Sequence, residues 1–134
     1  MSDATLHDLA ASLDTTEMRE VRARRAAEIV RAARGFRWAG IYDVDDDRIE
    51  AVGHSGVQAP VFIEFPADRG AIGDAVRMRA TVVHGAQVIV PILGAESGIP
   101  MGILVVERTE TGSFTDDDRA FIERCATAMM PLFE

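Results

Sequence analysis

The 134-residue chain contains no lysine and no asparagine, and all 14 of its basic side chains are arginines. Lysine forms the Schiff base of pyridoxal-phosphate enzymes and is the phosphate-binding cation of Walker-type ATPases, so both activities are excluded. Because lysine and asparagine have A-rich codons, their absence also predicts a GC-rich genome, which we expect to be bacterial.

Cysteine is nearly absent, since Cys125 is the only one. A single cysteine forms no intrachain disulfide, which fits a reducing cytoplasm. Its position on the apolar side of an expected helix predicts a buried, unactivated thiol. The three histidines, His7, His54 and His84, have no ligand-type spacing, and we expect neither a metal site nor a cofactor.

No apolar run approaches the ~18 residues of a membrane-spanning helix, and residues 1–9 lack the pattern of a signal peptide. The formal net charge of −8 argues against a nucleic-acid partner, because such binding depends on neutralising phosphates. Hydrophobic residues make up 48% of the chain, enough for the core of one domain. We therefore expect a cytoplasmic domain with neither a membrane nor a nucleic-acid partner.

Periodicity and turn residues predict an α+β domain of mostly antiparallel strands. We expect a flexible N-terminal arm over residues 1–13 and a single domain over residues 14–134. Asp14 and Glu17 have the spacing of a capping box, and Gly35 is a typical helix stop. The expected helices span residues 14–34, 71–79 and 116–133, and the expected strands span residues 36–44, 48–54, 61–65, 81–84, 88–93 and 101–107.

Polar and aromatic side chains predict a candidate pocket on the sheet. Trp38 and Tyr42 share one face of an expected central strand, Glu107 ends another strand, and Gln87 begins its hairpin partner. If those strands are neighbours, these residues line a small-molecule pocket; otherwise the two aromatics are ordinary core. Arg69 precedes two glycines that open a short helix, where either an anion site or a simple left-handed turn is expected.

The acidic residues gather in two places that we do not interpret as metal sites. The segment Asp43–Asp47 begins like a calcium loop, but Arg48 stands where the invariant glycine belongs, so a hairpin turn is expected. The acids at residues 116–118 follow Thr115, a good N-cap, and suit the positive end of a helix.

The segments WAGIYDV, GAIGDAV, VIVPIL, GIPMGILVVE and SFTDDDRAFIERCA, within residues 32–133, resemble the successive blocks of a GAF domain. Within that family the chain is most similar to free methionine-(R)-sulfoxide reductases. The resemblance implies a profilin- and PAS-related, six-stranded antiparallel sheet, with the first strand beside the last. It also implies N- and C-terminal helices together on one face and the short helix on the other.

The reactive cysteines of that enzyme are missing, and Ile72 stands where one of them is expected. Of the carboxylates that hold its substrate, Glu107 matches one, whereas Gln87 and Val105 replace two others. Sulfoxide reduction by thiols needs a nucleophilic cysteine and usually a resolving one. The connection before the VIVPIL strand is also short, which predicts a shallow, small or absent pocket.

The favoured interpretation is a non-enzymatic GAF-like domain that binds a small ligand or a protein partner. The alternatives are a sulfoxide-reductase-like enzyme and a scaffolding dimer of roadblock or profilin-like topology. The resemblance also implies that the terminal helices pair, often in a bundle with a second subunit. The expected interface of such a homodimer consists of Met18, Arg22, Ile29, Met129 and Phe133.

Overall fold

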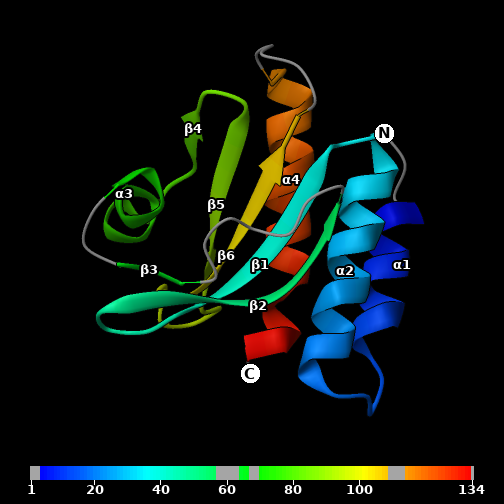
Figure 1. Cartoon of the computed structure of the whole chain (residues 1–134). Coiled ribbons are helices and arrows are strands. Elements are labelled where there is room, and N and C mark those ends of the chain that lie inside the picture. Colours follow the sequence, from blue (N-terminus) through cyan, green and yellow to red (C-terminus); the bar gives the residue numbers. More distant parts are fainter. Residues whose placement is uncertain (1–3, 57–63, 67–69, 109–113, 134) are drawn as a thin grey trace.

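The computed structural model describes residues 4–56, 64–66, 70–108 and 114–133. Four α-helices and a short 3-10 helix, η1, accompany six strands in this part of the chain (Figure 1). The elements are α1 (Ala4–Leu13), α2 (Arg19–Ala33), β1 (Trp38–Val44), β2 (Arg48–Gly56), β3 (Glu64–Pro66), α3 (Gly70–Met78), β4 (Val82–His84), β5 (Gln87–Leu93), β6 (Pro100–Glu107), α4 (Asp116–Ala128) and η1 (Met130–Phe133).

The strands form an antiparallel sheet in the order β3-β2-β1-β6-β5-β4. β1 therefore lies beside β6, so the first strand is next to the last, as the GAF resemblance implies. The predicted α+β class with an antiparallel sheet is confirmed. The third strand, expected over residues 61–65, lies partly outside the described residues, where β3 covers Glu64–Pro66.

The two faces of the sheet carry separate hydrophobic clusters. Residues of α1, α2 and α4 pack with Ala39 and Ile41 of β1, whereas α3 packs on the face that holds Trp38 and Tyr42. This division follows from the strand geometry, because successive side chains of β1 point to opposite faces. Figure 1 shows α3 apart from the other three helices.

Small residues allow α2 to lie close to the sheet. Its buried side chains are Ala23, Ala26, Ala27 and Val30. A Cβ atom added at Gly53 of β2 would lie 2.7 Å from the backbone nitrogen of Arg24, so glycine is required for this approach. The sequence thus sets the distance between helix and sheet by omitting side-chain volume on both sides.

Of the flexible arm expected over residues 1–13, the described part, Ala4–Leu13, is α1, a ten-residue helix that packs on the domain. Leu9 is fully buried and Leu13 is 4% exposed, and both belong to the same cluster as α2 and α4. The spacing of Leu6, Leu9 and Leu13 gives the helix one apolar side. That side accounts for the packing.

The capping box expected at Asp14 and Glu17 does not form. α2 begins at Arg19, after Met18, and its N-terminus has no side-chain cap. Glu17 instead accepts two hydrogen bonds from Arg25, at 2.7 and 3.0 Å. The chain must turn between α1 and α2, and the residues expected to start the helix form that turn. The expected stop is correct, since Gly35 follows α2 with φ of +65°.

α4 begins as predicted at Thr115, which forms a capping box with Asp118. The Asp118 carboxylate also accepts hydrogen bonds from Arg34 at 2.8 Å and from Arg108 at 3.1 Å. The Arg34 guanidinium lies 4.4 Å from the centre of the Phe121 ring. The end of α2 and the beginning of α4 are therefore joined by a charged and aromatic cluster.

The hairpin β5–β6 is also formed, and β5 extends beyond the short β4. Pro91 pairs with Ile103 of β6 but lies past the end of β4, where the outer side of β5 is an edge that tolerates proline. The acidic segment after β1 is a hairpin turn, closed by a 2.9 Å bond from the Asp45 amide to the Arg48 carbonyl. Of the helices that the structure describes, none has the length and apolar character needed to cross a membrane.

Candidate ligand-binding site

The face of the sheet beneath α3 brings together four of the five predicted pocket residues. In the strand register Trp38 of β1 lies opposite Glu107 of β6, and Glu107 lies opposite Gln87 of β5. These three residues therefore form one row across three neighbouring strands. Tyr42 lies four residues further along the same face of β1, with its ring centre 6.4 Å from that of Trp38. Arg69 lies outside the described residues.

Trp38 is held by glycines. A Cβ atom at Gly40 would overlap the indole ring, and one at Gly56 would lie 2.8 Å from the Trp38 Cα atom. The ring therefore lies flat over the backbone of β1, and Trp38 is only 6% exposed. Its indole nitrogen is buried and makes no hydrogen bond within the part of the chain that the structure describes. A buried N–H without an acceptor is costly, so this donor is suited to a bound acceptor group.

The polar end of the row is a hydrogen-bonded pair. The Gln87 amide nitrogen donates to a Glu107 carboxylate oxygen at 3.0 Å, and both side chains are half-buried. Burial, and then the negative charge of Glu107, raise the pKa of Tyr42 far above its ordinary value. The phenol is protonated at neutral pH, as tyrosine ordinarily is, and the raised pKa keeps it protonated in alkaline solution as well. The site thus combines indole and phenol donors with one carboxylate.

His54 belongs to this site although the sequence analysis treated it as an isolated histidine. It lies opposite Gly40 in the β1–β2 register, and its ring stacks on Trp38 with centres 6.3 Å apart. Its Nδ1 atom is buried and has no hydrogen-bond partner among the described residues. Plain period-two alternation from the hairpin turn would have placed His54 opposite Ala39, on the other face of the sheet. The bulge between Ile41 and Tyr42 shifts the register by one residue and brings His54 to the face of Trp38.

Apolar side chains form the floor and cover of the site. Ile49, Ile89, Ile103 and Val105 are buried in the sheet. α3 packs above them through Ala71, Ile72, Ala75 and Val76. Where a sulfoxide reductase is expected to carry a cysteine and a further carboxylate, this chain places Ile72 and Val105. The arrangement is therefore an apolar cluster with polar groups at one end.

The only cysteine is not part of this site. Cys125 is buried in the other cluster, between α4 and the opposite face of the sheet. Burial raises the pKa of its thiol to about 12, so the thiolate is scarce at neutral pH. Among the described residues there is also no group of three or more metal-binding side chains that could hold an ion.

The predicted dimer residues have different environments. Met129 is fully buried in its own chain, in the cluster that also contains Leu9 and Leu13 of α1. Its expected position at an interface is therefore wrong, because the helical layer that includes α1 already covers it. Phe133 folds back onto the sheet, where a Cβ atom at Gly102 would overlap its ring.

The other predicted interface residues lie on or next to α2. The Arg22 guanidinium donates to the backbone carbonyls of Leu13 and Glu17, at 3.3 and 3.1 Å, and so fixes the α1–α2 turn. Ile29 is partly buried against the core. Met18 is 71% exposed, and of the five it is the one with a largely free side chain.

Solved structures with the same arrangement identify the fold. The GAF domain of a phosphoenolpyruvate-protein phosphotransferase from Acinetobacter matches 99% of this chain and 94% of its own length, with a TM-score of 0.83 and 14% identity. The chain has a GAF fold. No protein-family model matches the chain, and no curated protein does either.

Two further structures with the GAF fold come from proteins of different kinds. One is the free methionine-R-sulfoxide reductase from Neisseria meningitidis in complex with its substrate, with 22% identity, 99% and 92% coverage and a TM-score of 0.81. The other is a putative GAF sensor protein from Burkholderia vietnamiensis, with 19% identity, 93% and 83% coverage and a TM-score of 0.80. The likeness shows the fold of this chain, and the proteins that share this fold include an enzyme and a putative sensor.

Proposed function

We propose that this chain is a non-enzymatic sensor domain that binds a polar small molecule on the α3 face of its sheet. The observation that carries the proposal is the buried Trp38 N–H, which has no acceptor among the described residues and lies in one row with Gln87 and Glu107. A ligand acceptor atom on this N–H would remove the cost of the buried donor. Glu107 would hold a cationic or hydrogen-bond-donating group of the same ligand.

The site is better suited to binding than to sulfoxide reduction. A thiol mechanism needs a nucleophilic sulfur at the substrate, and Cys125 lies on the other side of the sheet with a raised pKa. We therefore expect no thiol-dependent turnover of free methionine-(R)-sulfoxide. Turnover above the blank that disappears in Cys125→Ser would establish the reductase alternative instead.

Trp38 provides the assay, because it is the only tryptophan in the chain. We expect a saturable change in its fluorescence with a member of a panel of amino acids, their sulfoxides, and nucleotides. Free methionine-(R)-sulfoxide is the first probe, since the Neisseria protein was solved with its substrate. A panel that leaves the fluorescence unchanged at millimolar concentration would contradict a sensor for these classes.

Two variants connect the signal to the site. Glu107→Gln keeps the side-chain volume and removes the charge, so a cationic ligand should bind about tenfold more weakly by calorimetry. Trp38→Phe keeps an aromatic ring and removes the N–H, which should also weaken binding. The control is Glu96→Gln, an exposed change in the β5–β6 turn, which should leave the affinity unchanged.

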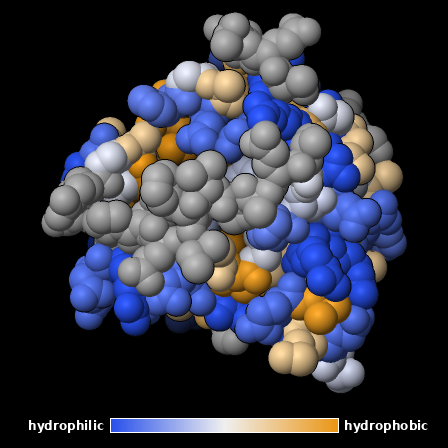
Figure 2. Space-filling model, in the orientation of Figure 1, coloured by the Kyte–Doolittle hydropathy of each residue, from blue (hydrophilic) through white to orange (hydrophobic). Residues whose placement is uncertain are grey.

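We also propose that the chain forms a homodimer through the outer surface of α2, where Met18 is exposed and Ile29 is partly exposed. Side chains of this kind contribute binding energy when a partner covers them. On the face drawn in Figure 2, apolar residues appear as small patches between hydrophilic ones, which favours a modest interface. A scaffolding role of the roadblock type is the alternative, and it would need a dimer without any ligand response.

A further inference from the structure

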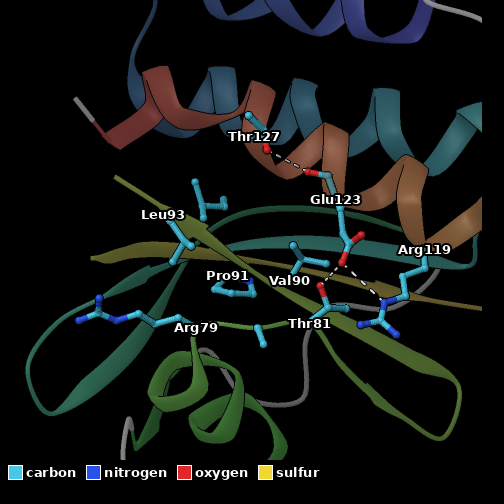
Figure 3. A pocket seen from close by; sticks show the side chains of 10 residues that line it. Arg79, Thr81, Val90, Pro91, Leu93, Arg119, Glu123 and Thr127 are labelled. Atoms are coloured by element: carbon cyan, nitrogen blue, oxygen red, sulfur yellow. Dashed lines mark hydrogen bonds and ion pairs between the residues drawn. The ribbon is translucent and has the colours of Figure 1, made fainter. Parts of the chain in front are cut away.

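A hollow lies at the edge of the sheet, on the side of α4, with a volume of about 360 Å³ (Figure 3). It shares no lining residue with the site around Trp38. Three segments form its walls: the connection from α3 to β4, the second half of β5, and one side of α4. The lining residues are Arg79, Ala80, Thr81, Val90, Pro91, Ile92, Leu93, Arg119, Glu123 and Thr127.

The hollow exists because β4 is much shorter than β5. β4 pairs with β5 only along Gln87–Ile89. Beyond that point, no strand in the described part of the chain pairs with the outer edge of β5. An unpaired strand edge is a template for another strand.

Two backbone bonds show which residues of β5 face that edge. The Arg108 amide donates to the Ala86 carbonyl at 3.0 Å, and the Gly94 amide donates to the Ile99 carbonyl at 2.8 Å. The backbone N–H and carbonyl groups of the even-numbered residues of β5, and of the residues that flank it, therefore point toward β6. Backbone groups point alternately to the two sides of an antiparallel strand. The N–H and carbonyl groups of the odd-numbered residues therefore point to the outer edge of β5, away from β6.

Pro91 and Leu93 are the odd-numbered residues beyond β4. Proline has no N–H to leave unpaired, so it suits an outward-facing position. The edge then offers the Pro91 carbonyl together with the N–H and carbonyl of Leu93. This is the set of groups that an added extended segment would pair with.

Arg79 stands at the mouth of the hollow in an unusual conformation. α3 ends with bonds from the Ala80 amide to the Ala75 carbonyl and from the Arg79 amide to the Val76 carbonyl, both 3.3 Å, which form a Schellman motif. Arg79 occupies its left-handed position with φ of +52°, where glycine is usual and an ordinary side chain costs energy. Among the described residues its exposed guanidinium has no hydrogen-bond or ion-pair partner.

The charges of the opposite wall are already paired. The Glu123 carboxylate accepts a hydrogen bond from the Thr81 hydroxyl and lies 3.6 Å from the Arg119 guanidinium. Figure 3 shows these contacts on the side of the hollow away from Arg79. The lining therefore carries two cations and one anion, with Arg79 left to attract an acidic group.

We propose that this hollow is a docking site for an extended acidic segment of a partner protein. The segment adds a short strand to the outer edge of β5, where its backbone pairs with Pro91 and Leu93. A carboxylate of the segment binds the Arg79 guanidinium. Arg79 thus replaces glycine in the α3 Schellman motif because its side chain contacts the partner.

The test is a titration of the ¹⁵N-labelled chain with the acetylated and amidated peptide Thr-Val-Glu-Val-Thr, followed by NMR. We expect saturable shifts of the Leu93 and Thr81 amides at millimolar peptide. A peptide with a methylated backbone at the paired positions should bind at least about tenfold more weakly, since it lacks the N–H groups. The proposal is overturned if the Leu93 amide does not respond, or if the methylated peptide binds equally well.

Two variants isolate the charge. Arg79→Gly removes the guanidinium and the left-handed strain, so the protein should be as stable or more stable while the peptide binds about three- to tenfold more weakly. Arg77→Ala, two residues earlier at an exposed position of α3, removes a charge of the same sign outside the hollow and should leave the affinity unchanged. Equal affinity of Arg79→Gly and the parent chain would exclude the carboxylate contact.

Discussion

At the scale of single residues, glycines decide what the large side chains can do. Gly40 and Gly56 provide the surface on which the Trp38 ring lies, and Gly102 does the same for Phe133. Each large ring occupies the space in which any residue other than glycine would have its Cβ atom. Trp38 and Gly40 are two positions apart in one strand, so a sequence read for periodicity places them on one face. It gives no indication that one lies on top of the other.

We predict that Gly40→Ala lowers the free energy of unfolding by about 1–3 kcal/mol, because the new methyl group overlaps the Trp38 ring. Trp38 fluorescence should change with it, since the ring must move. Denaturant unfolding with both fluorescence and circular dichroism measures the two effects. Ala32→Ser, at an exposed position of α2, is a suitable control. Gly85→Ala in the β4–β5 turn is not, because alanine would be strained at its φ of +60°. A Gly40→Ala protein with unchanged stability and fluorescence would contradict the placement of the indole.

A second prediction at this scale concerns Asp118. Burial acts to raise its pKa, but hydrogen bonds from Arg34 and from the backbone and side chain of Thr115 outweigh it and lower the pKa below 3.8. A lowered folded-state pKa means that the stabilisation is present above the unfolded value and is lost as pH falls through the folded value. We therefore expect Asp118→Asn to be less stable than the parent at pH 7.

The two proteins should converge as the pH falls below about 4, where the parent loses the carboxylate contribution. Unfolding by urea at several pH values measures this difference. Asp116→Asn, an exposed change in the first turn of the same helix, should cost no more than about 0.5 kcal/mol. If the free energies of unfolding of Asp118→Asn and the parent differ by the same amount at every pH down to the acid limit, the effect comes from packing and not from charge.

At the scale of the elements, what could be predicted depended on how local the signal was. The Thr115 cap and the β5–β6 hairpin follow from neighbouring residues, and both were expected with nearly correct bounds. The start of α2 was placed too early, because the residues expected to begin the helix form the turn after α1, where the Asp14 amide bonds back to Ala10 and Glu17 pairs with Arg25. α1 was missed as a packed element because its three leucines acquire meaning only when α2 and α4 lie beside them.

The same reasoning explains the candidate site. Trp38, Gln87 and Glu107 were expected together because they lie at ends of strands that become neighbours, and Tyr42 because it shares the face of Trp38. His54 was not, because a bulge shifts the register of β2 by one residue. The hollow beside Pro91 could not be foreseen either, since it depends on where β4 stops. Strand lengths are set by the whole sheet, not by the three residues of β4.

We predict that α1 contributes to stability as part of the core. Leu9→Ala should lower the free energy of unfolding by about 2–5 kcal/mol, because Leu9 is fully buried among residues of three helices. His7→Ala, an exposed change on the same helix, should alter it by less than about 0.5 kcal/mol. Equal stability of both variants in denaturant unfolding would return residues 1–13 to the role of a loose arm.

At the scale of the whole molecule, the burial of Met129 changes how a dimer must be tested. Had Met129 been at the interface, replacing it would have separated the subunits. In this fold it lies inside the chain with no exposed surface, so Met129→Asp would unfold the domain and say nothing about assembly. The exposed alternative is Met18, at the beginning of α2 and away from both proposed binding sites.

We predict a mass near twice 14.5 kDa by sedimentation equilibrium at micromolar concentration. Met18→Asp should shift the protein toward 14.5 kDa without a loss of stability, because its side chain is 71% exposed in the monomer and a carboxylate there stays hydrated. The same carboxylate would be desolvated at an apolar interface, which is costly without a partner charge. Met78→Asp is the matched control, since Met78 is 66% exposed but lies on α3, on the opposite face of the sheet.

If Met78→Asp separates the subunits and Met18→Asp does not, the dimer forms through the α3 face. It would then cover the ligand site, and binding and assembly would compete. If neither variant nor the parent departs from 14.5 kDa, the domain is monomeric, and any signal from its ligand site must pass to a partner of another kind.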